Sequence, residues 1–420
     1  MPEGIEVDKT VETKAGEKTF AGEWSKNVLT GSGPRKHEDE LVVGHCLDPF
    51  EGRRAATIPY ENLLDGVLAV GDSGSGKSTF STNLLVQLAS AGYGFCHIDT
   101  TGECKNLLRR LPEARLEDVV LLGPIGGEVR NGFDLFETGP QNHSVADAAA
   151  TTSSVIHAGE PAGNVSQKLG ESAAKLAIEL DIPLPELLDV FSLDQDETDV
   201  DRFGPIMDKL LTIDEDSEEL DPLKHRFIRL IENSSVRKGI AHPDPCSLYN
   251  AVQQGKIVLV AAGGYQTREA KRQFIGASLR KLSEVVRHRD KNSEMFIISI
   301  DELKQNELSE YRLEELFLDA REHNVGMLSI VQHLSQLTED DKNLILNSSE
   351  NLFCFRQTDI RSANILTPIL DVEGHSDLMN LPLYTAFVTI SARYESADMQ
   401  LEMFPPLEPT RESNDDRQFY

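Results

Sequence analysis

The chain has 420 residues, of which 70 are acidic and 41 are basic, giving a formal net charge of −29 at pH 7. This length suits a core domain of about 250 residues with one or two smaller units. The chain contains no run of about 18 apolar residues, so no transmembrane helix is predicted. The first residues also lack the basic and apolar regions of a signal peptide. We therefore expect a cytoplasmic protein with no transmembrane segment of its own.

The acidity has two interpretations. Such a surface repels nucleic acid and anionic membranes at ordinary salt, so the ligands could be something other than polyanions. Alternatively, the acidity is a solvation adaptation to a high-salt cytoplasm, as in a halophilic archaeon, where surface fields are screened within a few ångströms. The acidic residues are spread along the chain instead of forming one tail, which favours the second interpretation.

Cysteine usage limits the kinds of site that the chain can hold. Five cysteines occur and none forms a C-x-x-C pair. A zinc site or a disulfide framework is therefore not expected, and a reducing compartment fits the pattern.

Taken in order, the chain divides by pattern into five segments. Residues 1–58 predict an N-terminal arm with a small β region. Residues 59–140 and 251–405 alternate apolar strands with helices, whereas the acidic, helix-patterned residues 141–250 predict an all-α insertion. Residues 406–420 predict a polar tail.

The apolar runs place the strands of the alternating segments. Core strands are expected at 66–70, 94–99, 119–122, 256–260, 295–300, 326–331 and 352–355, with 384–390 closing the sheet. Helices are expected near 79–89, 267–289 and 308–322. Apolar strands separated by helices are typical of an α/β fold whose mainly parallel sheet is covered on both faces.

One glycine-rich stretch fits the phosphate-binding pattern G-x-x-x-x-G-K-[ST] at every fixed position. Its residues are Gly71, Asp72, Ser73, Gly74, Ser75, Gly76, Lys77 and Ser78, followed by Thr79 at the start of the next helix. In such a loop the backbone N–H groups and the helix N-terminus hold phosphates. Lys77 would reach the β- and γ-phosphates, and the Ser78 hydroxyl would ligate Mg²⁺. Because no Asn-Lys-x-Asp guanine motif is present, ATP is the expected nucleotide.

A second acidic motif follows the strand predicted at 295–300. The strand ends in Asp301 and Glu302, which is the Walker B pattern. Asp301 would hold the water shell of Mg²⁺, and Glu302 would orient the attacking water. A glutamate at this position favours hydrolysis over nucleotide binding alone.

Other polar residues near strand ends are candidates for the same site. Gln332 ends the next strand, where an amide can touch the γ-phosphate and the water. Arg321 and Arg356 are candidates for an arginine that a neighbouring subunit supplies to the transition state; a surface salt bridge is the alternative for each. Asp99 could contact the magnesium shell or a subunit interface, or could cap the helix that follows Thr101.

The segment 267–292 is locally basic. On a helical wheel, Arg272, Arg280 and Arg287 fall along one flank of the predicted helix. This flank could face DNA or an acidic neighbouring subunit, or it could be a solvated face.

Together these residues resemble the FtsK/HerA superfamily of ring-forming P-loop ATPases. The resemblance rests on Gly71–Ser78, the 99–103 stretch, Asp301 and Glu302, Arg321 and Gln332, with the helical insertion between early and late strands. Further similar stretches are 250–260, 355–359 and 381–388. Within the superfamily the chain is most similar to TraG/TraD-type coupling ATPases of conjugation and type IV secretion and to archaeal HerA-like DNA translocases.

The resemblance implies a RecA-like P-loop fold, ATP sites between the subunits of a hexamer, and DNA in the central pore. Three departures stand against a close match. Ala320 replaces a common glycine before the arginine, Val331 replaces a common threonine before the glutamine, and the transmembrane helices of membrane-bound coupling proteins are not predicted. A soluble relative, or docking at the membrane through a partner, is then expected.

The sequence leaves several functions open. The leading hypothesis is an ATP-driven DNA translocase, with a relaxase, a nuclease or a membrane channel as a possible partner. One alternative is a genome-packaging or protein-pumping ATPase on the same fold. Another is a nucleotide-gated scaffold that recruits a nuclease or a defence effector.

Overall fold

The computed structural model describes residues 5–6, 10–13, 16–19, 23–24, 40–48, 52–139, 145–157, 164–187, 204–206, 220–303, 313–392 and 395–410. Eleven strands form one sheet in the order β6-β5-β17-β16-β15-β7-β14-β13-β8-β12-β9. Their bounds are β5 Glu40–Asp48, β6 Gly52–Pro59, β7 Val67–Val70, β8 Gly94–Asp99, β9 Val119–Leu122, β12 Ile257–Ala261, β13 Phe296–Leu303, β14 Val325–Val331, β15 Asn351–Phe355, β16 Thr385–Ala392 and β17 Glu395–Glu402. Separate two-stranded pairs are β1 (Ile5–Glu6) with β4 (Glu23–Trp24), β2 (Thr10–Thr13) with β3 (Gly16–Thr19), and β10 (Pro124–Ile125) with β11 (Glu128–Val129).

The strands from β15 to β9 are all parallel, as predicted. The prediction that residues 384–390 close the sheet is wrong. β16 runs antiparallel to β15 and is followed by β17, which pairs with the β5–β6 hairpin. β17 was missed because its apolar residues alternate with polar ones, whereas the predicted strands were continuous apolar runs. The hairpin also places residues 40–59 in the same sheet as the core strands.

Helices cover both faces of the sheet, and the side chains of each strand alternate between two cores. On β7, Leu68 and Val70 belong to one core and Val67 and Ala69 to the other. The second core includes α2 (Lys77–Ser90) and α3 (Cys104–Leu108). The first core includes α11 (Arg268–Arg287), α13 (Leu313–Ala320), α14 (Glu339–Asn347), α15 (Ile360–Leu366) and α16 (His375–Met379). This is the predicted α/β architecture.

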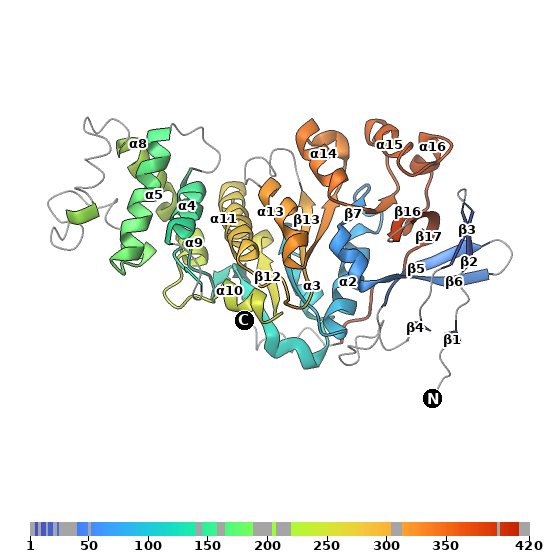
Figure 1. Cartoon of the computed structure of the whole chain (residues 1–420), viewed down its shortest axis with the longest axis horizontal. Coiled ribbons are helices and arrows are strands. Elements are labelled where there is room, and N and C mark those ends of the chain that lie inside the picture. The colour runs from blue at the N-terminus through green and yellow to red at the C-terminus, as the bar shows by residue number, and fades with distance from the viewer. Residues whose placement is uncertain are drawn as a thin grey trace.

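The segment predicted as an all-α insertion is helical where the structure describes it. Its helices are α4 (Val145–Ile156), α5 (Asn164–Glu179), α8 (Leu220–Glu232), α9 (Ser234–Ile240) and α10 (Leu248–Gln253). α4, α5 and α8 lie at one end of the molecule, with the β5–β6 hairpin at the other (Figure 1). The exact domain boundaries stay predictions.

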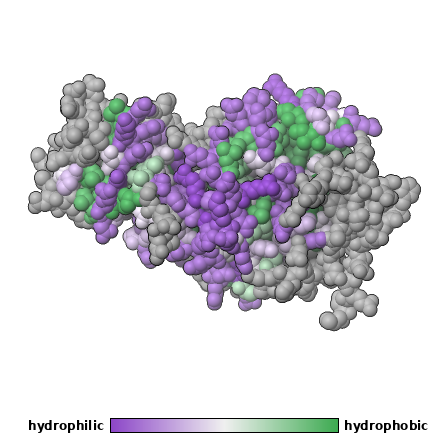
Figure 2. Space-filling view, in the orientation of Figure 1, coloured by the Kyte–Doolittle hydropathy of each residue, from purple (hydrophilic) through white to green (hydrophobic). Residues whose placement is uncertain are grey.

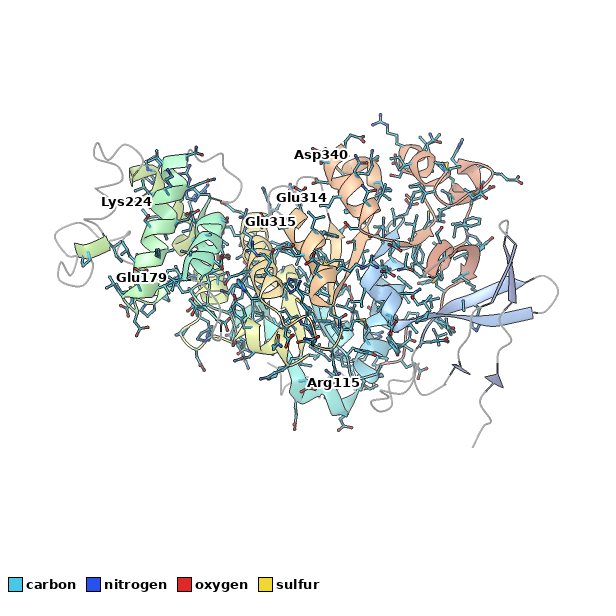
Figure 3. All side chains as sticks on the ribbon, viewed as in Figure 1. Arg115, Glu179, Lys224, Glu314, Glu315 and Asp340 are labelled. Atoms are coloured by element: carbon cyan, nitrogen blue, oxygen red, sulfur yellow. The ribbon has the colours of Figure 1, made fainter. Side chains whose placement is uncertain are left out.

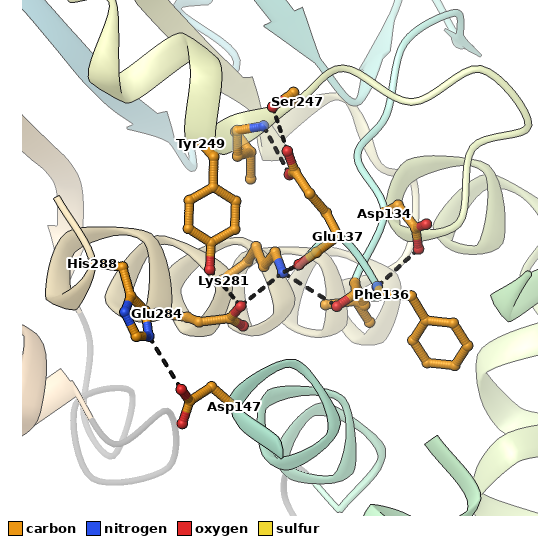
Figure 4. A network of polar contacts seen from close by, with 11 residues as sticks. Asp134, Phe136, Glu137, Asp147, Ser247, Tyr249, Lys281, Glu284 and His288 are labelled. Atoms are coloured by element: carbon orange, nitrogen blue, oxygen red, sulfur yellow. Dashed lines mark hydrogen bonds and ion pairs between the residues drawn. The ribbon is translucent and has the colours of Figure 1, made fainter. Parts of the chain in front are cut away.

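A buried polar network joins the two ends of this insertion to α11 (Figure 4). Glu137, just before the insertion, accepts hydrogen bonds from the Ser247 hydroxyl and the Leu248 N–H near the end of the 141–250 segment. The fully buried Lys281 ammonium donates to the Leu135 carbonyl at 3.3 Å and lies 3.1 Å from Glu284 Oε1. Lys281 also donates to the Glu137 carbonyl. The network therefore fixes where the insertion leaves and rejoins the ATPase-like core.

The surface shows the acidic composition. Hydrophilic residues cover the middle of the face in Figure 2. The residues labelled in Figure 3 include Glu314 and Glu315 on α13 and Asp340 on α14. These three are exposed and belong to the first turns of their helices. Carboxylates in a first turn are stabilised by the helix dipole. Because α13 and α14 run back toward the starts of β14 and β15, these first turns lie at the edge where the parallel strands end.

Among the described residues, no helix is long and apolar enough to span a membrane.

Candidate active site

The phosphate-loop sequence lies at the carboxyl edge of the sheet, between β7 and α2. Gly76 precedes α2 with φ +119°, and Gly74 has φ +75° with open space around it. Both are left-handed conformations that favour glycine. A Cβ added to Gly71 would lie 2.6 Å from Phe355 Cβ. The glycines therefore let this loop turn tightly against β15. Because they carry no side chains, the open side of the loop is free to hold phosphates.

Lys77 lies inside the loop. Its ammonium donates to the carbonyl of Gly71 at 2.5 Å and to that of Asp72 at 2.8 Å. Burial lowers the pKa of Lys77, and the nearby Asp301, Asp72 and Glu302 carboxylates oppose that decrease. The lysine is thus held among acids at the point where the β- and γ-phosphates of a nucleotide would lie.

The remaining loop residues differ in exposure. Ser73, Gly74 and Ser78 are exposed, Thr79 is half-buried and Ser75 is buried. The buried Ser75 hydroxyl has no hydrogen-bond partner among the described residues. The open position of Ser78 fits the predicted role of its hydroxyl as a Mg²⁺ ligand.

Asp72 ties the loop to the connection that follows β15. Its N–H donates to the Arg356 carbonyl at 2.9 Å, and its Oδ1 accepts from the Thr358 N–H and hydroxyl, both at 2.9 Å. The Arg356 Nε lies 3.9 Å from Asp72 Oδ2. Arg356 is therefore placed beside the phosphate loop of its own chain.

Asp301 is brought to the same edge by β13. Its side chain is buried, and Thr101 Oγ1 donates to its Oδ2 at 3.2 Å. Burial, followed by the neighbouring Asp99, raises the pKa of Asp301 to about 6. A cation at this position would stabilise the ionised form, so the site fits Mg²⁺. Mg²⁺ typically takes one or two carboxylates together with phosphates and water, which is consistent with the lack of any cluster of three metal ligands among the described residues.

Asp99 acts as a cap in the structure. Its carboxylate accepts hydrogen bonds from the N–H groups of Thr101, Gly102 and Cys104 at 2.6–2.9 Å. Burial opposes ionisation, but the backbone donors, led by Cys104, outweigh it and lower the pKa of Asp99. Of the alternatives from the sequence, the geometry favours a capping role at the start of α3, although Glu103 occupies the N-cap position itself.

Glu302 has an uncommon backbone conformation. Its φ is +60°, and the pairing of β13 with β14 is interrupted between Ile300 and Leu303. A non-glycine residue in this region is strained, and such strain is concentrated at functional sites. The bulge takes the half-buried Glu302 out of the regular alternation of the strand, beside Asp301 and within electrostatic reach of Lys77.

Gln332 follows the last residue of β14, which pairs directly with β7. Its side chain is half-buried and makes no hydrogen bond to another described residue. The next residue, His333, was not predicted as part of the site; its Nδ1 lies 3.8 Å from Asp72 Oδ1. Thr358 was missed as well. Each follows a strand at the carboxyl edge, which is the signal that could have found it.

The comparisons with known proteins concern the fold of the chain. No family model and no curated protein sequence matches the chain. The plasmid coupling protein TrwB, in complex with a non-hydrolysable ATP analogue, is similar with a TM-score of 0.63 and 16% identity, over 84% of this chain and 89% of that chain. VirB4 of Thermoanaerobacter pseudethanolicus is similar with a TM-score of 0.60 and 15% identity, over 89% of this chain and 97% of that chain. The chain has the TrwB fold.

At these identities the likeness concerns the fold. TrwB bound to ADP and Mg²⁺ gives a similar result, with a TM-score of 0.61 and 17% identity over 84% of this chain. The RecA-like P-loop fold that the resemblance predicted is thereby confirmed.

Within the TrwB-like fold, Arg321 lies far from the phosphate loop of its own chain. Its Nη2 is 2.8 Å from Asp65 Oδ1 and its Nη1 is 3.6 Å from Glu350 Oε1. Asp65 precedes β7 and Glu350 precedes β15, so Arg321 is at the amino edge of the sheet. The four residues of β7 put about 13 Å of strand between this edge and the loop. Its side chain is 66% exposed.

The basic flank predicted on α11 is not a continuous surface. Arg280 is buried, although Arg272 and Arg287 are exposed. Arg287 Nη1 lies 3.3 Å from Glu315 Oε2 on α13. These three arginines therefore do not form one exposed stripe, because Arg280 is buried. For the exposed Arg272 and Arg287, the alternatives of DNA, a neighbouring subunit or a solvated face stay predictions.

Proposed function

We propose that the chain is an ATP-hydrolysing subunit of a hexameric ring that moves DNA, in conjugative transfer or secretion or as a HerA-like translocase. The nucleotide part of the proposal is supported by the loop, Lys77, Asp301 and Glu302, which lie together at one sheet edge. Solved structures of TrwB contain ADP with Mg²⁺ and an ATP analogue. The same fold in this chain, with the same type of loop, supports the same ligands.

Each residue then has a definite role in hydrolysis. Lys77 and the loop N–H groups would hold the β- and γ-phosphates, while Ser78 and Asp301 would hold Mg²⁺. The bound Mg²⁺ would neutralise charge on the phosphate oxygens. Glu302 would orient and accept a proton from the attacking water, and Gln332 would lie where it can contact both the water and the γ-phosphate. Arg356, tied to Asp72, would act on the nucleotide of its own chain.

The position of Arg321 carries the ring proposal. It is exposed and lies at the sheet edge opposite its own loop, so it cannot reach a nucleotide bound there. Arg321 could instead contact the nucleotide bound to a neighbouring subunit. An arginine supplied in this way raises the rate of hydrolysis on the order of 10³-fold or more. Asp65 and Glu350 fix the position of its guanidinium at the surface.

The acidic surface constrains where DNA could lie. The first turns of α13 and α14 carry carboxylates at the same edge as the loop, and this edge would repel a polyanion. A ring that encloses DNA needs little equilibrium affinity, so the net charge of −29 is compatible with a path through the pore, away from that edge.

DNA-stimulated ATP hydrolysis tests the proposal. We expect Lys77→Ala and Glu302→Gln to abolish turnover, with Glu117→Gln, an exposed carboxylate in the 113–118 turn, as a matched control that keeps it. Hydrolysis that survives both site variants would show that the site is wrongly assigned. Stimulation by a partner protein but not by DNA would point to the protein-pumping or packaging alternative, and binding without turnover to a scaffold.

Mixing two inactive variants tests whether the sites are shared. A ring containing both Arg321→Ala and Lys77→Ala subunits forms some sites with an intact loop from one subunit and an intact arginine from its neighbour. We expect mixing to restore hydrolysis that neither variant has alone. If Arg321 only stabilises its own chain through Asp65 and Glu350, mixing will restore nothing.

A further inference from the structure

An exposed aromatic residue lies beside the phosphate loop without any role in the functions considered above. Tyr384 directly precedes β16 and has φ +59°. Its side chain is 40% exposed, and the preceding Leu383 is 49% exposed. A bulky residue in the left-handed region is a backbone outlier. Such outliers persist where the surrounding structure fixes them, and they are concentrated at functional sites.

Two backbone hydrogen bonds fix Tyr384 against the loop. Its N–H donates to the Ser75 carbonyl at 2.9 Å, and its carbonyl accepts from the Met403 N–H at 2.7 Å. A Cβ added to Gly76 would lie 3.0 Å from Tyr384 Cδ1. The edge of the ring therefore lies against Gly76, the residue that precedes α2, where the loop passes into the helix.

The position of Tyr384 in the sheet indicates which end of a nucleotide it would meet. β16 runs antiparallel to β15, with Phe355 opposite Ala386, so the start of β16 is at the carboxyl edge. Asp301 and Glu302 lie on β13, two strands away from β7 in the other direction. The γ-phosphate end of a nucleotide belongs with those carboxylates, which leaves the β15–β16 side of the loop for the nucleoside.

We propose that the Tyr384 ring is the platform on which the base of the bound nucleotide stacks, with Leu383 extending its apolar surface. This inference rests on the proposed nucleotide binding. Every base has a π-face, so a stacking platform without hydrogen-bonding groups aimed at the base edge accepts different bases. The subsite should then bind ATP and GTP with similar gains. Stacking of this kind is worth about 5- to 150-fold in affinity when the ring is removed.

The test compares ligands with and without a base. Calorimetry on the full chain would measure binding of Mg-ATP, Mg-GTP and Mg-tripolyphosphate to the wild type, Tyr384→Phe and Tyr384→Asn. Asparagine tolerates a positive φ and keeps the N–H that donates to Ser75, so it removes the ring without removing the loop contact. We expect Tyr384→Asn to weaken both nucleotides about 10-fold and to leave tripolyphosphate unchanged, while Tyr384→Phe binds all three like the wild type.

Each other outcome has a separate meaning. An equal loss for tripolyphosphate and for the nucleotides would show that Tyr384 only shapes the loop, which would overturn the stacking proposal. Unchanged nucleotide affinity in Tyr384→Asn would place the base elsewhere and would also overturn it. If the wild type binds neither nucleotide nor tripolyphosphate, the proposed nucleotide site itself is wrong. A Lys77→Ala variant with the same binding as the wild type would confirm that result.

Discussion

Asp301→Asn should stabilise the nucleotide-free protein, and the gain should depend on pH. Burial and Asp99 raise the pKa of Asp301 from 3.8 to about 6. One pKa unit corresponds to about 1.4 kcal/mol, so ionised Asp301 lowers the free energy of unfolding by about 3 kcal/mol. Its side chain is 5% exposed, and solvent screening therefore reduces this figure little. Asparagine keeps the acceptor for the Thr101 hydroxyl and removes the charge.

The sign of the pH dependence follows from proton binding. Below about pH 4 the carboxyl is protonated in both states, and the substitution should change little. Between about pH 4 and 6 the folded state binds more protons than the unfolded state, so the wild type loses stability as pH rises. Above about pH 6 the full difference of about 3 kcal/mol applies.

Urea unfolding of both proteins at several pH values, in EDTA and without nucleotide, would measure this difference. Glu117→Gln is the control, since Glu117 is exposed and its substitution should leave stability nearly unchanged. A gain that does not vary between pH 4 and 7, or a loss at pH 7, would refute the reasoning. With Mg-ATP present the order should reverse, because the charged carboxylate binds the metal more strongly than the neutral asparagine amide.

Two further predictions concern backbone strain and the buried network. Glu302→Gly and Glu302→Ala both remove the carboxylate, and both should abolish hydrolysis. Only glycine relieves the strain at φ +60°, so Glu302→Gly should be the more stable variant by about 1 kcal/mol in urea unfolding. At an ordinary strand position alanine would be the more stable of the two, and finding that order here would contradict backbone strain at Glu302. Lys281→Met leaves the fully buried Glu284 carboxylate without its cation, so it should lower the free energy of unfolding by about 3–5 kcal/mol. The double variant Lys281→Met with Glu284→Met should recover most of that loss. A double variant as unstable as Lys281→Met would show that Lys281 stabilises the fold through the Leu135 and Glu137 carbonyls instead.

The sequence predicted the elements whose signals are local. The phosphate loop carries its conformation in its glycines, and the strands from β15 to β9 are apolar because they are buried on both faces. The positions of Lys77, Asp301, Glu302 and Gln332 relative to the ends of these strands predict that the four residues share one edge of the sheet. Parallel strands share one carboxyl edge, so a residue's place at the end of a strand was sufficient.

Features that depend on tertiary packing could not be predicted in this way. β17 carries a two-residue alternation of apolar and polar residues through Ala397, Met399 and Leu401, but this signal is short and its place between β16 and β5 depends on tertiary packing. Arg280 shares a helical flank with Arg272 in sequence, but in the fold Arg280 is buried and Arg272 is exposed. The contact of Tyr384 with Ser75 joins residues more than 300 positions apart, and a positive φ at a tyrosine has no sequence signature.

Arg321 and the phosphate loop lie at opposite ends of the same central strands, and this has a mechanical consequence in the proposed ring. β7 and β14 are paired in parallel and buried on both faces, and close-packed cores of this kind resist deformation. A movement that closes the loop around a nucleotide would therefore be carried to the amino edge as a rigid displacement of Arg321. Each subunit would change the site of its neighbour when its own site closes. The distance between Arg321 and the loop of its own chain would thus allow successive sites in the proposed ring to be coupled.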